Sequence, residues 1–446
     1  VKDNYVYAGT VVEEGEITIK VKKVGGTSQY EKIVGMIEET EKLKSASESK
    51  ASHIADKLVP YTLGGTALTY LLTRNVTKAL SVLMVDFSCA LKLAMPITVL
   101  SAIREASLHN VTVKGGKFLE AVSEADTIVF DKTGTLTKAK PTVVDVVSFC
   151  DETPDELLRI AACLEEHFPH PVARAVVRCA QEEGLQHEEE HAQVEYVVAH
   201  GIASTLYGKA VRVGSRHYIE CDEGIDLSPL EAEIDAQARM GRSLLYLAID
   251  GKLAGFLAIE DPLRPECPQV LKQLEELGFR RILMLTGDDE RTARAVAGKL
   301  GLKEYRSQVL PADKADVIAD LTAQGCKVLM VGDGINDAPA LSASHVGVAM
   351  CDGADLAREV ANVLLTRPDL SGLITARLLG RATLRRIHIN FAATMLLNSM
   401  FLAGGLFMIL TPGVSALLHN LTTLGVTLNA MRPHLPGRHA RQLEAA

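Results

Sequence analysis

The residues with the clearest chemical potential form the segment Asp-Lys-Thr-Gly-Thr-Leu-Thr at positions 131–137. The apolar run at 127–130 predicts a buried strand that delivers Asp131 to its end, and small, turn-prone residues follow at once. A carboxylate beside an ammonium and hydroxyl groups suits nucleophilic attack on a phosphoryl group, which gives an aspartyl phosphate. The first three residues alone would indicate only a turn, whereas all seven in this order favour a phosphoryl-transfer site.

Two further polar segments each follow a predicted strand. Thr-Gly-Asp at 286–288 comes after one apolar run, and Gly-Asp-Gly-Ile-Asn-Asp at 332–337 comes after another. Three strand ends with carboxylates suit an open parallel α/β sheet, whose ligands bind at the carboxyl edge. Phosphoryl transfer needs carboxylates for magnesium and a cation for the phosphate, and Lys314, at the start of an amphipathic helix, is a candidate cation. Each Asp alone would more often cap a turn or helix, so the ordered set carries the prediction.

With these three segments in this order, the sequence resembles the P-type ATPases, ion pumps that cycle through a phosphorylated aspartate. The resemblance implies that Asp131 is the nucleophile and that magnesium is held by Asp131, the Thr133 carbonyl and Asp333. It also implies ATP as the substrate and places Lys314 and Thr286 on the phosphoryl oxygens. The remaining residues that it assigns to the catalytic site are Lys132, Gly287, Asp288, Asn336 and Asp337.

Thr133 separates two functions of the same fold. In the soluble phosphatases of the haloacid-dehalogenase fold, the position two residues after the nucleophile holds an Asp that acts as general acid. Here that position is Thr133, which by this resemblance leaves an aspartyl phosphate slow to hydrolyse, as a pump requires. A haloacid-dehalogenase-type phosphatase and a non-transporting, ATP-binding regulatory protein are the alternatives from other classes.

A second cluster resembles the nucleotide domain of the heavy-metal subclass. Glu165 lies five residues before His170-Pro171, as in the Glu…His-Pro motif that holds adenine in that subclass. Gly201 and Gly214 match parts of its glycine-containing nucleotide turns. The sequence departs from the usual residues at two positions, where Ala203 replaces a glycine and Ser215 replaces an asparagine.

Composition narrows the class of partners. The chain has 446 residues, a charged fraction of 23% and a formal net charge of −9, with no basic tract, so a nucleic-acid partner is not expected. Its eight cysteines include no C-x-x-C pair, which argues against a disulfide framework or a soluble zinc or copper module. Reduced cytosolic thiols are the simplest interpretation.

Four apolar stretches predict membrane helices: 58–72, 79–103, 391–410 and 414–431. The last two form a hairpin that is apolar on all sides, without the polar face that a helix at the surface of a soluble protein has. Basic residues flank this hairpin on both sides, which places its ends in the cytosol. We therefore expect an integral membrane protein of a bacterial plasma membrane, in contact with the lipid bilayer and with its catalytic domains in the cytosol.

The expected fold is multidomain α/β with transmembrane helices: a haloacid-dehalogenase-like, Rossmann-like phosphorylation domain with an inserted α+β nucleotide-binding domain. The predicted boundaries are as follows: 1–56, end of the actuator domain, without its Thr-Gly-Glu loop, and linker helix; 57–105, two transmembrane helices; 106–141, phosphorylation domain, first part; 142–258, nucleotide-binding domain; 259–380, phosphorylation domain, second part; 381–432, two transmembrane helices; 433–446, cytosolic tail. Residues 1–24 are predicted to form strands and 25–48 a helix.

Polar residues inside the predicted spans are candidates for the transported ion. Heavy-metal pumps usually carry Cys-Pro-Cys in the second of these spans, where this chain has Phe87-Ser88-Cys89. One thiolate with oxygen and imidazole donors suits a divalent ion better than copper(I), so Asp86, Ser88, Cys89 and His419 are the expected ligands. Lys92 is either a countercharge within the membrane or a residue that snorkels toward the cytosol.

The predicted function is ATP-driven transport, in the direction of export, of a divalent transition metal such as zinc, cobalt, manganese or iron(II). A copper(I) pump with an altered membrane site is the alternative within the class. The transported cation and the bilayer are the expected partners, and the sequence names no intracellular metal donor.

Overall fold

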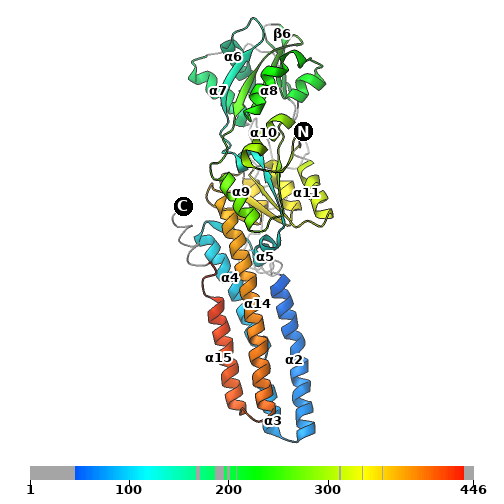
Figure 1. Ribbon diagram of the computed structural model, residues 1–446, viewed down its shortest axis with the longest axis vertical. Coiled ribbons are helices and arrows are strands. Elements are labelled where there is room, and N and C mark those ends of the chain that lie inside the picture. Colours follow the sequence, from blue (N-terminus) through cyan, green and yellow to red (C-terminus); the bar gives the residue numbers. More distant parts are fainter. Residues whose placement is uncertain are drawn as a thin grey trace, which may run out of the picture. The chain divides into compact units, whose positions relative to one another are not determined.

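The computed structural model describes residues 46–166, 171–185, 195–197, 201–206, 208–310, 313–333, 335–353 and 355–435. The chain divides into two compact units (Figure 1). The first contains the residues up to Glu124 and those from Thr375 onward, and the second is Ala125–Ile374. The strands and most of the helix expected before residue 46 lie outside the described residues.

Long helices make up most of the first unit: α2 (Ala46–Thr73), α3 (Val76–Leu83), α4 (Ser88–Leu108), α5 (Gly116–Glu124), α14 (Ser371–Leu406) and α15 (Pro412–Ala430), with the short strand β1 (Val111–Val113). Helix α4 packs against α2 and against α15. Ala51 and Ala55 are buried against Leu91 and Met95, since small side chains on α2 let the two helices approach closely.

The second predicted span is not one continuous helix. The structure breaks it between α3 and α4, and Asp86 lies in the break. The Asp86 carboxylate accepts hydrogen bonds from the backbone N–H groups of Ser88 and Cys89 at 2.9 and 3.2 Å. These N–H groups open α4 and have no partner within the helix, so Asp86 stabilises the restart of the helix.

Two segments of the described residues are long and apolar enough to cross a membrane, Val76–Leu108 and Ser371–Leu406. The first contains the predicted span 79–103, and the second contains the predicted span 391–410 as far as Leu406. The spans predicted at 58–72 and 414–431 are helical, in α2 and α15, but these helices do not meet the same test of composition. Their membrane insertion stays a prediction.

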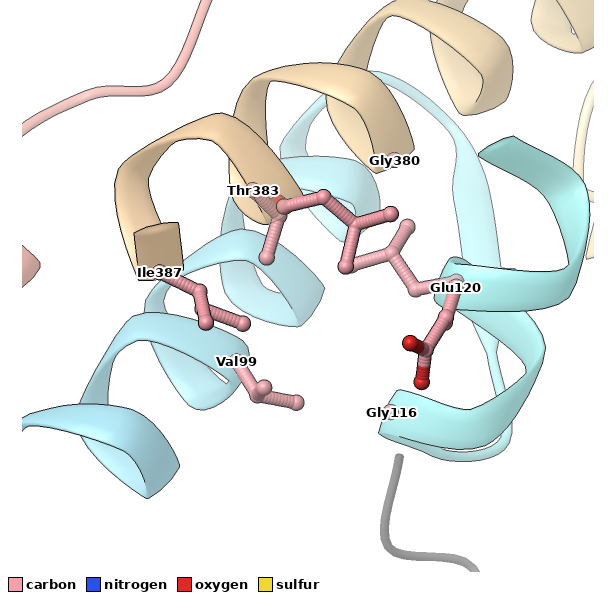
Figure 2. A pocket seen from close by; sticks show the side chains of 8 residues that line it. Val99, Gly116, Glu120, Gly380, Thr383 and Ile387 are labelled. Carbon is pink, nitrogen blue, oxygen red and sulfur yellow. The ribbon is translucent and has the colours of Figure 1, made fainter. Parts of the chain in front are cut away.

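A small cavity of about 10 Å³ lies between α4, α5 and α14 (Figure 2). Its walls include Val99, Gly116, Glu120 and Thr383. Gly380 lies where a Cβ would come within 2.6 Å of the Leu119 carbonyl oxygen, so α14 lies against α5 at this residue. A space of this size holds one water molecule at most, and it is therefore no ligand site.

The second unit contains a parallel sheet whose strands follow the order β13-β12-β11-β2-β9-β10. The strands are β2 (Thr127–Asp131), β9 (Arg281–Leu285), β10 (Glu304–Arg306), β11 (Val328–Gly332), β12 (Val346–Met350) and β13 (Val363–Leu365); the helices are α9 (Cys267–Glu276), α10 (Glu290–Leu300), α11 (Asp313–Ala323), α12 (Ala338–Ala343) and α13 (Asp355–Val360). Asp131 pairs in register with Leu285, and Phe130 pairs with Val331. The polar segments after β2, β9 and β11 therefore start at the same edge.

An antiparallel sheet interrupts this parallel domain in the sequence. Its order is β3-β8-β7-β6-β5-β4, with β3 (Thr142–Ser148), β4 (Glu195–Val197), β5 (Gly201–Leu206), β6 (Lys209–Gly214), β7 (Ser243–Ile249) and β8 (Lys252–Glu260). Its helices are α6 (Pro154–Glu165), α7 (Pro171–Glu182) and α8 (Glu231–Arg239), and α6 and α7 bury apolar side chains against the sheet. A parallel α/β domain with an α+β insertion confirms the predicted fold class.

Candidate active site

Asp131 is the last residue of β2 and is buried at the carboxyl edge of the parallel sheet. The loop Lys132–Leu136 follows it, and Gly134 takes a positive φ of 75° there. A Cβ at Gly134 would lie 1.5 Å from an Asp333 carboxylate oxygen. Glycine is therefore required on two grounds, its backbone conformation and the close approach of Asp333.

Lys314 connects the carboxylates at the centre of the site. Its Nζ lies 2.7 Å from Asp131 Oδ1 and 2.7 Å from Asp337 Oδ1, and all three side chains are buried. Burial alone would lower the pKa of Lys314, but the negative charges of Asp131 and Asp337 outweigh it and raise that pKa. Lys314 is thus a permanent cation one hydrogen bond away from the predicted nucleophile.

Asp131, Asp333 and Asp337 bring three carboxylate oxygens within 4.8 Å of one another, the one such group of metal-ligating side chains among the described residues. Burial, and then repulsion from Asp131 and Asp337, raises the pKa of Asp333 to about 7. Burial, and then Asp337, raises the pKa of Asp131 to about 6. Oxygen ligands at this spacing suit Mg²⁺, so the residues present fit the ion that the resemblance implies.

Lys132 and Asp288 form a second ion pair beside the first. The Asp288 carboxylate also accepts hydrogen bonds from the hydroxyls of Thr286 at 3.0 Å and Ser243 at 2.9 Å. Burial would raise the pKa of Asp288, but Lys132 overcomes this and lowers it. Among the other predicted catalytic residues, Thr133 and Asn336 are exposed, whereas Thr286 is buried. Gly287 lies between Thr286 and Asp288 in the sequence.

Arg264 is a structural part of this site that the sequence reasoning missed. Its buried guanidinium donates hydrogen bonds to the backbone carbonyls of Thr135 and Gly134, each at 2.9 Å. The Asp261 carboxylate accepts a hydrogen bond from the Thr137 hydroxyl. Asp261 and Arg264 flank Pro262-Leu263 directly after β8. Charged residues on both sides of a proline at the end of a strand are the sequence pattern that could have indicated their role.

The candidate nucleotide residues lie at the ends of elements of the antiparallel sheet. Glu165 is buried at the end of α6, and Pro171 begins α7. Gly201 and Gly214 pair across β5 and β6, and a Cβ at Gly201 would lie 2.3 Å from the Val213 carbonyl oxygen. His170 lies outside the described residues.

A cavity of about 390 Å³ extends from the antiparallel sheet to Gly287 and Asp288, after β9 of the parallel sheet. Its lining comes from both domains of the second unit: Ser215, Arg216, His217, Ser243, Leu244, Tyr246, Gly287, Asp288, Asp289, Gln308 and Leu310. This volume is within the range of small-molecule sites. The cavity therefore links one of the unusual nucleotide-turn positions, Ser215, to Asp288, next to Lys132.

The expected transport ligands are only partly brought together. Ser88 Oγ donates to an Asp86 carboxylate oxygen at 2.6 Å. Asn398 connects two of the helices, because its Nδ2 donates to the Asp86 carbonyl at 3.0 Å while its Oδ1 lies 3.4 Å from His419 Nδ1. Cys89 is exposed, and the described residues do not place Asp86, Cys89 and His419 in one compact group of metal-ligating atoms.

Comparisons with known proteins identify the family. A sequence profile of haloacid dehalogenase-like hydrolases matches residues 125–345. The crystal structure of a zinc-transporting PIB-type ATPase in its E2.Pi state superposes with a TM-score of 0.62 at 30% identity, covering 92% of this chain and 68% of that one. The chain belongs to the heavy-metal P-type ATPases. This confirms the family indicated by the three segments and the Glu…His-Pro cluster.

The chain is also similar to curated P-type ATPases that are longer than it is and that are named after the metals they export. The manganese-exporting P-type ATPase of Mycobacterium tuberculosis (strain ATCC 25618 / H37Rv) is 35% identical over 96% of this chain and 60% of its own length. The zinc-exporting P-type ATPase of Mycobacterium marinum (strain ATCC BAA-535 / M) is 35% identical over 92% of this chain and 56% of its own length. The chain thus spans less than two thirds of the curated relatives that it matches.

The contact between Gly134 and Asp333 gives a first prediction. Gly134→Ala should reduce phosphoenzyme formation from ATP by about 100-fold or more, since the new methyl group displaces the carboxylate of Asp333, which we expect to help hold Mg²⁺. Gly184→Ala is the matched control, because Gly184 also has a positive φ, of 72°, but no atom within 4 Å of its Cβ position. Phosphorylation assays and thermal unfolding of both variants check this. Equal losses of activity in the two variants would contradict it.

The raised carboxyl pKa values give a second prediction, for metal binding. If Asp131 and Asp333 hold Mg²⁺ as predicted, protons compete with the ion for them below about pH 7. Mg²⁺ affinity should therefore increase as the pH rises through 6 to 7, and binding at neutral pH should release protons. Calorimetry in two buffers of different ionisation enthalpy measures that release. In Asp333→Asn the pH dependence should weaken, and a proton release that stays at zero in the wild type would refute the prediction.

Proposed function

We propose that this chain is the catalytic and partly membrane-embedded portion of a pump that exports a divalent transition metal from the cytosol at the expense of ATP. Phosphorylation of Asp131 would drive the transport cycle. The observation that carries the proposal is the buried Asp131, held 2.7 Å from Lys314 in a group of three carboxylates. The family relationship and the names of the relatives support it.

Phosphoryl transfer needs a nucleophile in line with the leaving group and a neutralised phosphoryl charge. An Asp131 carboxylate oxygen forms the new bond to the γ-phosphorus, the bond from that phosphorus to the β,γ-bridging oxygen breaks, and ADP leaves. The ammonium of Lys314 stabilises the negative charge on the oxygens of the transferred group. Mg²⁺, held by Asp131, Asp333 and the Thr133 carbonyl, would supply further charge neutralisation when bound.

The second ion pair orients the loop around the nucleophile. Lys132 is held by Asp288, and Asp288 is held in turn by Thr286 and Ser243. Because Ser243 belongs to β7 of the antiparallel sheet, this network connects the nucleotide side of the cavity to the phosphorylation loop. Thr286 would turn its hydroxyl from Asp288 to a phosphoryl oxygen when ATP is present, and Asn336 and Asp337 would complete the site.

ATP would bind with adenine near Glu165, His170 and Pro171, beside Gly201 and Gly214. The cavity that runs from Ser215 to Asp288 then takes the phosphate chain toward Asp131. In this assignment residues 142–258 are the nucleotide-binding domain, and 106–141 and 259–380 are the two parts of the phosphorylation domain. Hydrolysis of the phosphoenzyme needs a general base from another residue, since Thr133 has a hydroxyl where a carboxylate could activate the water.

For the transported ion we propose a site near Asp86, Ser88, Cys89 and His419, within helices that cross a bacterial plasma membrane. Asn398 lies between Asp86 and His419, so oxygen and imidazole donors outnumber the single thiol. Such donors suit manganese, zinc, cobalt or iron(II) better than copper(I), which prefers thiolates. The catalytic domains would lie in the cytosol.

A phosphoenzyme assay on the full-length pump tests this proposal. Asp131→Asn should eliminate the acid-stable, hydroxylamine-sensitive phosphoenzyme while ATP still binds, because an amide is nearly isosteric with the carboxylate but cannot form the acyl phosphate. Asp151→Asn, at an exposed residue, is the control and should be phosphorylated as the wild type is. Full labelling of Asp131→Asn would refute the assignment.

A metal panel tests the membrane site. Cys89→Ala and His419→Ala should each lose most of the ATP hydrolysis stimulated by manganese, zinc, cobalt or iron(II). Phosphorylation from inorganic phosphate should persist, since that reaction uses only the phosphorylation domain. Stimulation by copper(I) that survives the removal of Cys89 would overturn both the ligand assignment and the divalent ion.

A further inference from the structure

Ion pairs join helix α8 of the antiparallel insertion to helix α10 of the parallel domain. The guanidinium of Arg291 on α10 contacts a carboxylate oxygen of Glu231, and its Nη1 lies 2.6 Å from Asp235 Oδ1. Glu231 and Asp235 are four residues apart on α8, so their side chains are neighbours on one face of that helix. Two anions of the insertion thus hold one cation of the parallel domain.

Hydrogen bonds to backbone carbonyls continue this contact along α10. The Thr292 hydroxyl donates to the Arg242 carbonyl at 3.1 Å, and Lys299 Nζ donates to the Met240 carbonyl. Gly241 has a positive φ of 78°, and a Cβ there would lie 3.3 Å from Lys299 Nζ. The turn between α8 and β7 therefore follows α10 over about two turns of that helix.

The apolar clusters described in the second unit do not cross from one domain to the other. Two consist of residues of the insertion, and a third consists of residues of the parallel domain. The chain passes between the two domains twice, before β3 and after β8. Domains of one chain that meet through polar contacts can move relative to each other. The polar contacts of α8 with α10 therefore influence how the two domains are oriented.

These ion pairs are connected to the cavity by Arg216, which lines it. Arg216 Nη2 lies 3.2 Å from Glu231 Oε2, so the Glu231 carboxylate lies between two guanidinium groups. The hydrogen bond with Glu231 raises the pKa of Arg291, whereas the positive charge of Arg216 acts in the opposite direction. An anion in the cavity beside Arg216 would offset the repulsion between the two arginines, and the phosphates of a nucleotide are such an anion.

We infer that Arg291 is a positioning residue for phosphoryl transfer: through Glu231 and Asp235 it holds the insertion, with its bound ATP, in the orientation that the transfer to Asp131 needs. This inference rests on the proposed function. Small displacements of the reacting groups reduce the rate of such a transfer steeply. The phosphates of ATP beside Arg216 strengthen the contact. When ADP has left, the repulsion between the arginines returns and the contact weakens, so that the next ATP can enter.

The exposure of these side chains suits a contact that forms and opens. The side chains of Arg291 and Glu231 keep 37% and 35% of their surface exposed. Ion pairs this exposed contribute little to the free energy of unfolding, and salt weakens them. Their loss should therefore change the orientation of the two domains more than it changes the stability of either one.

Phosphoenzyme formation by the full-length pump tests the inference, at saturating ATP and with Mn²⁺ or Zn²⁺ present. Arg291→Met should lower the rate by about tenfold, as expected for the loss of two partly exposed ion pairs. Arg291→Lys keeps a cation and should recover most of that rate. Arg294→Met is the matched control, because Arg294 lies on the same helix but pairs with Glu290 of that helix. This control should match the wild type.

The link to the nucleotide phosphates has its own measurement. A non-hydrolysable ATP analogue should bind several times more weakly to Arg291→Met than to the wild type, whereas AMP, which lacks the β- and γ-phosphates, should bind equally well to both. In a protein that already carries Arg216→Met, the effect of Arg291→Met on the analogue should become smaller, since contacting residues are coupled. Equal weakening for the analogue and for AMP would overturn the link.

A purely structural set of ion pairs gives a different pattern. Arg291→Met would then lower the melting temperature and leave the rate at saturating ATP unchanged, and that outcome overturns the inference. Should Arg291→Met fail to fold, Asp235→Asn removes only one of the two ion pairs. It should still slow phosphoenzyme formation severalfold, and a rate equal to that of the wild type counts against the inference.

Failure of the inference can be told apart from failure of the proposed function. If the wild-type pump forms no phosphoenzyme, the proposed function fails. Amide hydrogen exchange still decides the inference in that case, because it requires no turnover. With the ATP analogue present, α8 and the turn at Met240 and Gly241 should exchange faster in Arg291→Met than in Arg294→Met. Equal exchange in the two variants would reject Arg291 as the residue that holds the domains together.

Discussion

The ammonium of Lys314 between Asp131 and Asp337 is the contact that lets the catalytic carboxylates share the edge of the sheet. Two buried acidic groups and the half-buried Asp333 lie within 4.8 Å of one another, and their burial together with this repulsion raises the pKa values of Asp131 and Asp333. Removing one member of a buried ion pair typically costs about 3–5 kcal/mol. The three carboxylates therefore carry more negative charge than Lys314 alone neutralises, and a further cation would stabilise the site.

The backbone supports this arrangement through close approaches rather than through extra side chains. Parallel pairing in register aligns the ends of β2, β9 and β11, and Gly134 lets Asp333 approach the loop after the nucleophile. Arg264 then fixes the loop by its carbonyl groups. The loop Lys132–Leu136 needs this support, because Thr133 and Gly134 have non-helical backbone angles.

The sequence predicted which polar segments meet at the edge of the parallel sheet, because their positions follow from local patterns. An apolar run fixes where a strand ends, and parallel strands bring their carboxyl ends to one edge, so Asp131, Asp288 and Asp333 could be placed near one another without tertiary information. Contacts between distant side chains had no such signal. Arg264 lies 129 and 130 residues from the carbonyl groups that it binds, and the ion pair that Lys92 forms with Asp56 depends on how α2 packs against α4.

The membrane helices show the same limit in a different form. Hydropathy indicated the spans, but it did not show that Asp86 would end one helix and start the next. The two carboxylate oxygens of Asp86 each accept a backbone N–H group, so fewer lone pairs of this proposed ligand are free for a metal. At the break the Asp86 carbonyl accepts a hydrogen bond from the side chain of Asn398. Irregular backbone within a membrane is stable where it is buried in protein or lines a polar cavity, so we expect the path of the proposed transported ion at this break, where Asn398 connects Asp86 to His419.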